Sequence, residues 1–137
     1  MSSVMSYDGM SKIGSMLGAG SVIVMDDTTC MVKTLERIAE FYYEESCGQC
    51  TPCREGTGWL YRVVKRIVHG EGTQEDLDRL LAVANNISGN TICALGEAAA
   101  TPVLSFIKHF EEEFQYHIDH KCSMVSSSNT SEGQAAL

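Results

Sequence analysis

The stretch Glu45–Trp59, ESCGQCTPCREGTGW, carries three cysteines, Cys47, Cys50 and Cys53, and each is separated from the next by two residues. A fourth, Cys93, follows in the short run ICALGE. Two intervening residues allow successive thiolates to converge on one centre, and a cubane cluster needs four thiolates around it. The pattern therefore favours an iron–sulfur cluster, and with it electron transfer.

Zinc is the main alternative occupant of such a cysteine set. A zinc site more often uses two separate C-x2-C pairs, or one such pair with histidines, and a third cysteine in the same short loop is unusual for it. Thiols that hold no metal are the remaining interpretation. The spacing favours iron–sulfur and leaves both alternatives open.

The composition is that of a single globular domain. Of the 137 residues, 44% are hydrophobic and 20% are charged, which is enough apolar content for a modest core. The net charge of −8 argues against nucleic-acid binding, which needs clustered Lys and Arg. No apolar stretch is long enough to span a bilayer, and the N-terminus lacks the pattern of a signal peptide. We therefore expect an intracellular, soluble chain whose clustered cysteines serve as ligands rather than forming disulfides.

The apolar periodicity between about Thr28 and Gln115 is helical and falls into four segments, which predicts a mainly α fold built as a four-helix bundle. The faces expected in its core are Met31, Leu35, Ile38 and Tyr42; Trp59, Leu60, Val63, Val64, Ile67 and Val68; Leu77, Leu80, Leu81, Ala84 and Ile87; and Val103, Phe106, Ile107, Phe110 and Phe114.

The ends of these helices are predicted from capping residues. The first helix follows a cap somewhere in Asp26–Thr29, and the second has Thr51 as cap and Pro52 as its first residue. The third runs from a Thr73 cap to Gly89. The fourth is expected to place Pro102 in its first turn after a Thr101 cap, although Glu97–Ala100 could form a preceding turn.

The flanks are predicted to differ from the bundle. Val22–Met25 is a short β-branched run bounded by turn residues, which predicts a strand that needs a partner or forms the trailing edge of a larger β unit. The end of the chain, rich in Ser, Asn and Thr from about Ser126, is expected to be disordered. We therefore divide the chain into a β remnant with linker at residues 1–27, a helical iron–sulfur domain at residues 28–120 and a disordered tail at residues 121–137.

The cysteine loop would then sit at a helix N-terminus. Unpaired N–H groups and the positive end of the helix dipole stabilise thiolates there, together with the negative charge gained on reduction. Gly48 permits close approach of the backbone, and Thr51 can offer a hydroxyl. Because Cys93 belongs to another loop, a cluster would link two parts of the bundle. Loss of the cluster would therefore loosen the fold.

Other chemically capable residues lie outside the cysteine motif or beside it. Cys30 and Cys122 lie outside the motif and are predicted to be ordinary thiols. His117 and His120 are predicted to be solvated where the last helix frays. The crowding of Arg54, Arg62, Lys65 and Arg66 in one segment indicates either a solvated helix face or compensation for an anionic cluster or an acidic partner. No catalytic nucleophile is predicted.

These motifs resemble a known family. ESCGQCTPCREGTGW, followed by TICALGEAAATPV, is similar to the C-terminal part of the NADH-binding flavoprotein subunit of NADH:quinone oxidoreductase, respiratory complex I. The resemblance extends from GSMLGAGSVIVMDD to HFEEEFQYHIDHK. It implies that Cys47, Cys50, Cys53 and Cys93 ligate a [4Fe–4S] cluster in a helical domain preceded by a ubiquitin-like β domain, of which residues 1–27 would be the end.

The resemblance also implies cofactors and partners. The cluster would relay electrons from FMN reduced by NADH towards quinone, the distal acceptor. The partners would be other hydrophilic-arm subunits, above all the small [2Fe–2S] flavoprotein subunit, on the cytoplasmic side of a bacterial inner membrane or the matrix side in mitochondria. The family's flavin and NADH sites lie in a large N-terminal domain with a GRGGAGFPTG-like loop that this sequence lacks. We therefore expect a fragment that is inactive by itself.

Two alternatives accompany this interpretation. The same module occurs in the homologous subunit of NAD-dependent formate dehydrogenases and NAD-coupled hydrogenases. In a different class, four thiolates could hold zinc in a structural module that binds other proteins.

Overall fold

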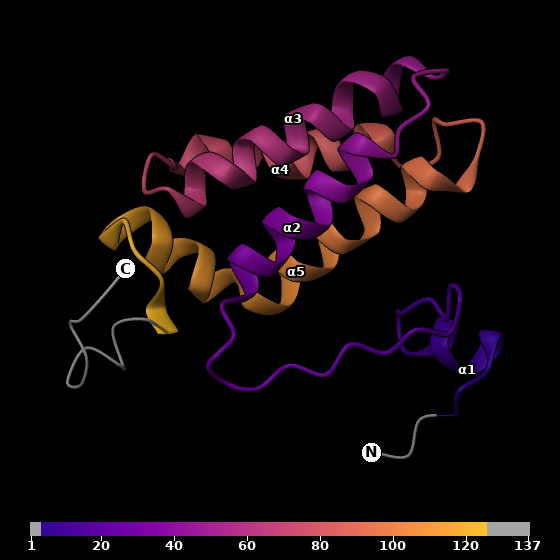
Figure 1. The fold of residues 1–137 in the computed structure, drawn as a ribbon, viewed down its shortest axis with the longest axis horizontal. Coiled ribbons are helices and arrows are strands. Elements are labelled where there is room, and N and C mark those ends of the chain that lie inside the picture. Colours follow the sequence, from indigo (N-terminus) through magenta and orange to yellow (C-terminus); the bar gives the residue numbers. More distant parts are fainter. Residues whose placement is uncertain (1–3, 126–137) are drawn as a thin grey trace.

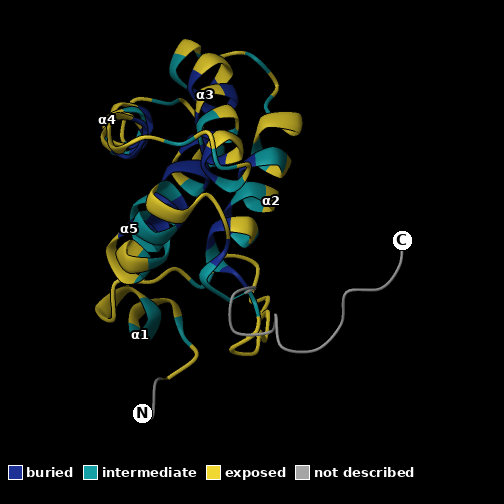
Figure 2. Cartoon of the chain, turned by 90° about the vertical axis from the view of Figure 1, so that its left-hand side faces the viewer, coloured by how far each residue is buried: buried dark blue, intermediate teal, exposed yellow. Residues whose placement is uncertain are grey.

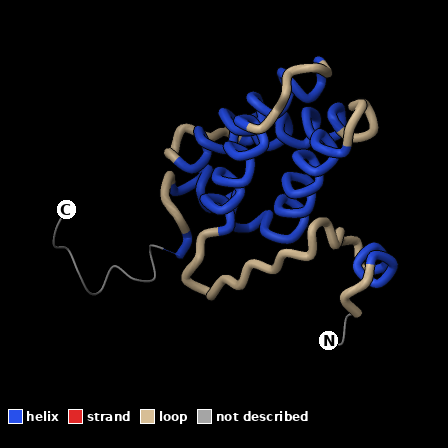
Figure 3. Tube along the Cα trace, turned by 45° about the vertical axis from the view of Figure 1, so that its right-hand side comes forward, coloured by secondary structure: helices blue, strands red, loops and turns tan. Residues whose placement is uncertain are grey.

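Five helices make up the computed structural model, which describes residues 4–125 (Figure 1). They are α1 (Tyr7–Lys12), α2 (Met31–Glu44), α3 (Thr51–Val68), α4 (Gln74–Ile87) and α5 (Ala94–His120). The described residues contain no strand, as the tube in Figure 3 also shows. The predicted mainly α fold is confirmed.

Helices α2 to α5 form the predicted bundle. Each of α2 and α4 contacts both α3 and α5, and α3 also contacts α5. The buried residues line the interior between these helices (Figure 2), and the largest fully buried apolar side chains are Leu35, Leu60, Ile67, Leu80, Ile87 and Phe114. On α2 the most buried positions are Val32, Leu35 and Ala39, so the core face lies about one residue away from the predicted stripe.

The predicted strand is absent from the described residues. Val22, Ile23 and Val24 are 67%, 76% and 90% exposed in an extended connection that leads to α2. A strand requires a neighbour to take its backbone hydrogen bonds, and this run has none among the described residues. The prediction of a strand here is therefore wrong. Earlier in the same N-terminal stretch lies the short helix α1. It is capped by Ser6, whose hydroxyl accepts a hydrogen bond from the N–H of Gly9.

The helix ends agree only in part with the predicted caps. The Thr73 cap of α4 is confirmed, because its hydroxyl accepts from the N–H of Asp76 while the Asp76 carboxylate accepts from the N–H of Thr73. The cap of α2 is Cys30, not a residue of Asp26–Thr29. Asp26 instead accepts hydrogen bonds from Thr28 and Thr29 in the preceding turn.

Helix α5 begins earlier than predicted. It starts at Ala94 and takes Pro102 into its interior, although Pro102 was expected in the first turn. The alanine-rich run before Pro102 has high helix propensity and favours the earlier start, although proline removes one N–H from the interior of the helix. The Thr101 hydroxyl donates to the Glu97 carbonyl at 2.8 Å, within the same turn. A kink follows at Phe110, whose φ and ψ of −129° and 30° are not helical.

The bundle places both cysteine loops at one end. The connection from α2 to α3 and that from α4 to α5 lie together on the right of Figure 1, whereas the start of α2 and the end of α5 lie at the opposite end. Residues 126–137 of the predicted tail lie outside the described part of the chain. Ahead of them, Ser123 is buried and Val125 packs against the core.

Candidate iron–sulfur site

Two of the four predicted ligands are the N-cap residues of long helices. Cys50 caps α3 and Cys93 caps α5, and neither helix receives a side-chain hydrogen bond at its cap. Thr51, predicted to be the cap, is the first helical residue instead. The first-turn N–H groups of both helices, with the positive ends of their dipoles, therefore lie at cysteine thiols.

A hydrogen bond joins the two cysteine loops. The backbone N–H of Ile92 donates to Sγ of Cys50 at 3.3 Å, although the residues are 42 positions apart in sequence. The loop that carries Cys93 thus lies against the loop that carries the other three cysteines. Within residues 4–125, no three His, Cys, Asp or Glu side chains are close enough together to hold a single metal ion. The structure thus brings Cys50 to the Cys93 loop without gathering the four thiols tightly.

The four thiols differ in exposure. Cys53 is buried, Cys50 is half-buried, and Cys47 and Cys93 are exposed. All four are free thiols, and no acidic residue occupies the first turn of α3. Soft thiolates at two helix N-termini suit an anionic thiolate-ligated group better than a hard, oxygen-ligated cation. The residues present therefore fit an iron–sulfur cluster.

Ser46, which the sequence did not single out, is a neighbour of the buried thiol. Its Oγ lies 3.3 Å from Sγ of Cys53. The hydroxyl of Thr57 donates to the Cys53 carbonyl at 2.8 Å and fixes the same residue from the other side. The predicted hydroxyl, that of Thr51, is exposed and has no hydrogen bond to a cysteine among the described residues.

The loop ahead of Cys93 is held by the helix that follows it. The Glu97 carboxylate accepts hydrogen bonds from the Ser88 hydroxyl at 2.7 Å and the Gly89 N–H at 2.9 Å, and these bonds lower the pKa of Glu97. A Cβ at Gly96 would lie 2.5 Å from Cγ2 of Thr91, so this helix can pass under the loop only without a side chain there. Glu97 therefore holds the loop ahead of Cys93 by hydrogen bonds, and Gly96 leaves room for that loop to pack against α5.

Arg54 is the basic residue that reaches the cysteine loop. Its guanidinium donates to the Gly48 carbonyl at 3.2 Å and pairs with Glu55 at 2.9 Å. Gly48 has a φ of +77°, which glycine adopts without strain, so its role is the tight turn between Cys47 and Cys50. Further along α3, Lys65 donates to the Tyr61 hydroxyl and Arg66 pairs with Asp76.

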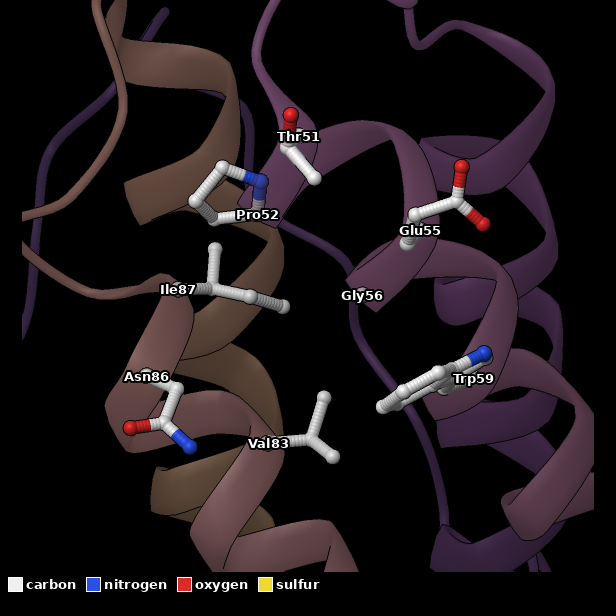
Figure 4. Close-up of a pocket in the computed structure, with 8 residues that line it drawn as sticks. All are labelled: Thr51, Pro52, Glu55, Gly56, Trp59, Val83, Asn86 and Ile87. Atoms are coloured by element: carbon white, nitrogen blue, oxygen red, sulfur yellow. The ribbon is translucent and has the colours of Figure 1, made fainter.

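An apolar groove of about 330 Å³ adjoins the cysteine loop (Figure 4). Pro52, Gly56 and Trp59 of α3 face Val83 and Ile87 of α4 across it. A Cβ at Gly56 would lie 2.6 Å from Cδ1 of Ile87, which shows how closely the two helices approach. Trp59 was expected in the core but is 53% exposed at the rim of this groove.

The prediction that His117 is solvated is wrong. Its side chain is 1% exposed, and its Nε2 lies 3.2 Å from Sγ of Cys30. The helix does not fray there, because α5 continues to His120 and the kink at Phe110 leaves its last turns packed against the core. His120 is exposed, as expected, and its ring stacks on that of Tyr116. Cys30 is a buried thiol and Cys122 an exposed one.

The burial of His117 predicts a loss of stability in acid. Burial lowers the pKa of His117 below the ordinary value of 6.5, and the charge of Lys33 acts in the same direction, whereas Glu113 and the Ile67 backbone oppose them. As the pH falls below about 6.5, the unfolded chain binds a proton at this residue before the folded chain does, so the free energy of unfolding decreases. One such group contributes a slope of at most about 1.4 kcal/mol per pH unit.

Urea denaturation between pH 7.5 and 5 checks this expectation. His117→Gln should flatten the decline by up to that slope, and His120→Gln, at an exposed position of the same helix, should leave it unchanged. Equal slopes in the wild type and in the His117 variant would show that His117 is not responsible.

The comparisons with known proteins agree on one family. The model described as the NADH-ubiquinone oxidoreductase-F iron–sulfur binding region matches residues 33–117. An F subunit of the NADH-quinone oxidoreductase of Rhizobium meliloti (strain 1021) is 51% identical over 116 residues, which are 85% of this chain and 27% of that protein. The corresponding F subunit of Mycobacterium tuberculosis (strain ATCC 25618 / H37Rv) is 49% identical over 113 residues, 82% of this chain and 25% of that protein.

A solved structure of another NAD-linked enzyme is also similar to this chain. An NAD+-reducing [NiFe]-hydrogenase in its H2-reduced state matches 72% of this chain and 17% of its own, with a TM-score of 0.69 and 33% identity. No helix of residues 4–125 is long and apolar enough to cross a membrane. The chain spans about a quarter of the length of the curated relatives it matches. Because the family model covers more than half of its residues, the chain belongs to the family of the NADH-ubiquinone oxidoreductase-F iron–sulfur binding region.

Proposed function

We propose that this chain carries electrons through a [4Fe–4S] cluster ligated by Cys47, Cys50, Cys53 and Cys93. The observation that carries the proposal is the hydrogen bond from the Ile92 N–H to Sγ of Cys50, which brings the Cys93 loop to the three-cysteine loop at two helix N-termini. When bound, a cluster of this kind accepts and releases one electron at a time. The helix dipoles and first-turn N–H groups favour the added negative charge.

The protein residues supply the setting for that transfer. Cys53 in the first turn of α3 is buried, which shields one side of the site from water, while Cys47 and Cys93 face solvent and hence a partner. In the full-length subunit we propose that the electrons come from FMN reduced by NADH and continue towards quinone through neighbouring hydrophilic-arm subunits, including the small [2Fe–2S] subunit, at the cytoplasmic face of the membrane. Without the flavin domain, the chain alone should not oxidise NADH.

A hydrogenase-type complex is the second candidate context. The match to the NAD+-reducing [NiFe]-hydrogenase, at 33% identity, supports it. Identities near 50% to relatives named as F subunits of NADH-quinone oxidoreductase favour the respiratory enzyme.

Anaerobic reconstitution with iron and sulfide tests the proposal. We expect about four irons and four sulfides per chain, a broad brown absorbance and an EPR signal in the dithionite-reduced protein. One zinc per chain with no visible absorbance would favour the structural zinc module instead. A chain that binds neither metal would overturn both functions.

A further inference from the structure

Ser46 connects two helices at the cysteine loop. It follows the end of α2 at Glu44, with Glu45 as the C-cap, and its Oγ reaches Sγ of Cys53 in the first turn of α3 at 3.3 Å. Ser46 is half-buried and Cys53 is 6% exposed, so this contact lies on the inner side of the loop, away from bulk water. A hydrogen bond in such a position is screened less than one at the surface.

The direction of this hydrogen bond follows from ligand chemistry. Between a free thiol and a hydroxyl, either group can donate. A cysteine that ligates iron is a thiolate and has no proton, so the serine hydroxyl becomes the donor and the sulfur the acceptor. Cluster binding would therefore convert this contact into a charge-assisted hydrogen bond to a ligand sulfur.

We propose that Ser46 is a positioning residue that raises the reduction potential of the cluster by donating this hydrogen bond to Sγ of Cys53. The inference rests on the proposed function. Reduction adds one electron, whose charge is shared with the ligand sulfurs, and a donor at such a sulfur stabilises the reduced state more than the oxidised state. Removing the donor therefore makes the cluster harder to reduce.

Sγ of Cys50 also accepts a hydrogen bond, but its donor is a backbone N–H. Cys50 accepts from the backbone N–H of Ile92, which every residue except proline would supply. Among the described residues, Ser46 is therefore the side chain whose hydroxyl lies within hydrogen-bond distance of the sulfur of a proposed ligand. Thr51 lies in the same loop, yet its exposed hydroxyl bonds to no cysteine among the described residues, which makes it a matched control.

The test is an EPR-monitored titration of the reconstituted chain with dithionite as reductant and ferricyanide as oxidant. Ser46→Ala should lower the equilibrium constant for one-electron reduction about fivefold, a shift of roughly −40 mV at 59 mV per tenfold change. Ser46→Thr, which keeps the hydroxyl, should restore the wild-type potential, and Thr51→Val should not change it. The titration reads only molecules that hold a cluster, so partial loading of a variant does not prevent the measurement.

The outcomes separate this inference from the function on which it rests. If the wild type binds no four-iron cluster, the proposed function fails. If the wild type binds the cluster and Ser46→Ala has an unchanged potential, the inference alone fails. It also fails if Ser46→Ala loses the cluster entirely, or if Ser46→Thr shifts the potential as far as Ser46→Ala does, because Ser46 would then only hold the loop together.

Discussion

Replacing any one of Cys47, Cys50, Cys53 and Cys93 by alanine is expected to abolish the four-iron cluster of the reconstituted chain. A cubane cluster with three thiolate ligands is open to solvent at one iron and loses that iron readily, so iron should fall from about four per chain to well under that number. Cys53→Ala should have the strongest effect, because this thiol is buried and hydrogen-bonded to Ser46. Iron and sulfide analysis with EPR of the reduced protein gives the answer.

Two cysteines outside the motif serve as controls for this series. Cys122 is exposed, and Cys30 is the N-cap of α2 beside His117, so substitution of either should leave the iron content unchanged. The ligand set would be wrong if Cys122→Ala lost the cluster while Cys93→Ala retained it. Because a cluster would link the α2–α3 and α4–α5 connections, each ligand variant should also lose the stabilisation that cluster loading gives the wild type.

The sequence was most informative where the determining interactions are local. The capping box of α4 joins two residues three positions apart, Thr73 and Asp76, so it is visible in the sequence and present in the structure. The apolar periods of the bundle are local in the same way. The spacing of Cys47, Cys50 and Cys53 likewise reports on one short loop, and it led to the family that the comparisons support.

Two of the failed predictions depended on contacts between distant residues. Val22–Met25 has strand-like residues but no partner among the described residues, and a strand cannot form by itself. His117 is polar and near the helix end, yet the kink at Phe110 and the proximity of Cys30 place it in the core. Neither the kink nor that neighbour, 87 positions away, leaves a periodic signal.

The site shows the same division. Four cysteines could be named from spacing, whereas Ser46 and the Ile92 N–H emerge only when the loops are folded against each other. The cap of α3 is Cys50, one residue before the predicted cap, Thr51. A predicted ligand therefore lies at the positive end of the helix dipole. Capping preferences rank Ser, Thr, Asp and Asn first, so they favoured Thr51.

Loss of Asp76 should destabilise the bundle strongly without touching the cysteines. Its carboxylate is fully buried and accepts hydrogen bonds from the N–H and hydroxyl of Thr73 at 3.0 and 3.1 Å. It also pairs with Arg79 in its own helix at 3.2 Å and with Arg66 of α3 at 3.5 Å. The Asp76 carboxylate therefore stabilises the first turn of α4 and links α4 to α3.

Asp76→Ala is expected to lower the free energy of unfolding by about 3 kcal/mol, because it removes the carboxylate half of the capping box and its charge-assisted hydrogen bonds from a buried position. Asp76→Asn keeps the shape and one acceptor and should lose about half as much. Glu75→Ala is the matched control: Glu75 pairs with the same Arg79, but its side chain is 79% exposed, so the loss should stay below about 0.5 kcal/mol. Urea denaturation of the cluster-free proteins measures all three. Equal losses for Asp76→Ala and Glu75→Ala would mean that exposed charge pairing, rather than the buried Asp76 carboxylate, stabilises the start of α4.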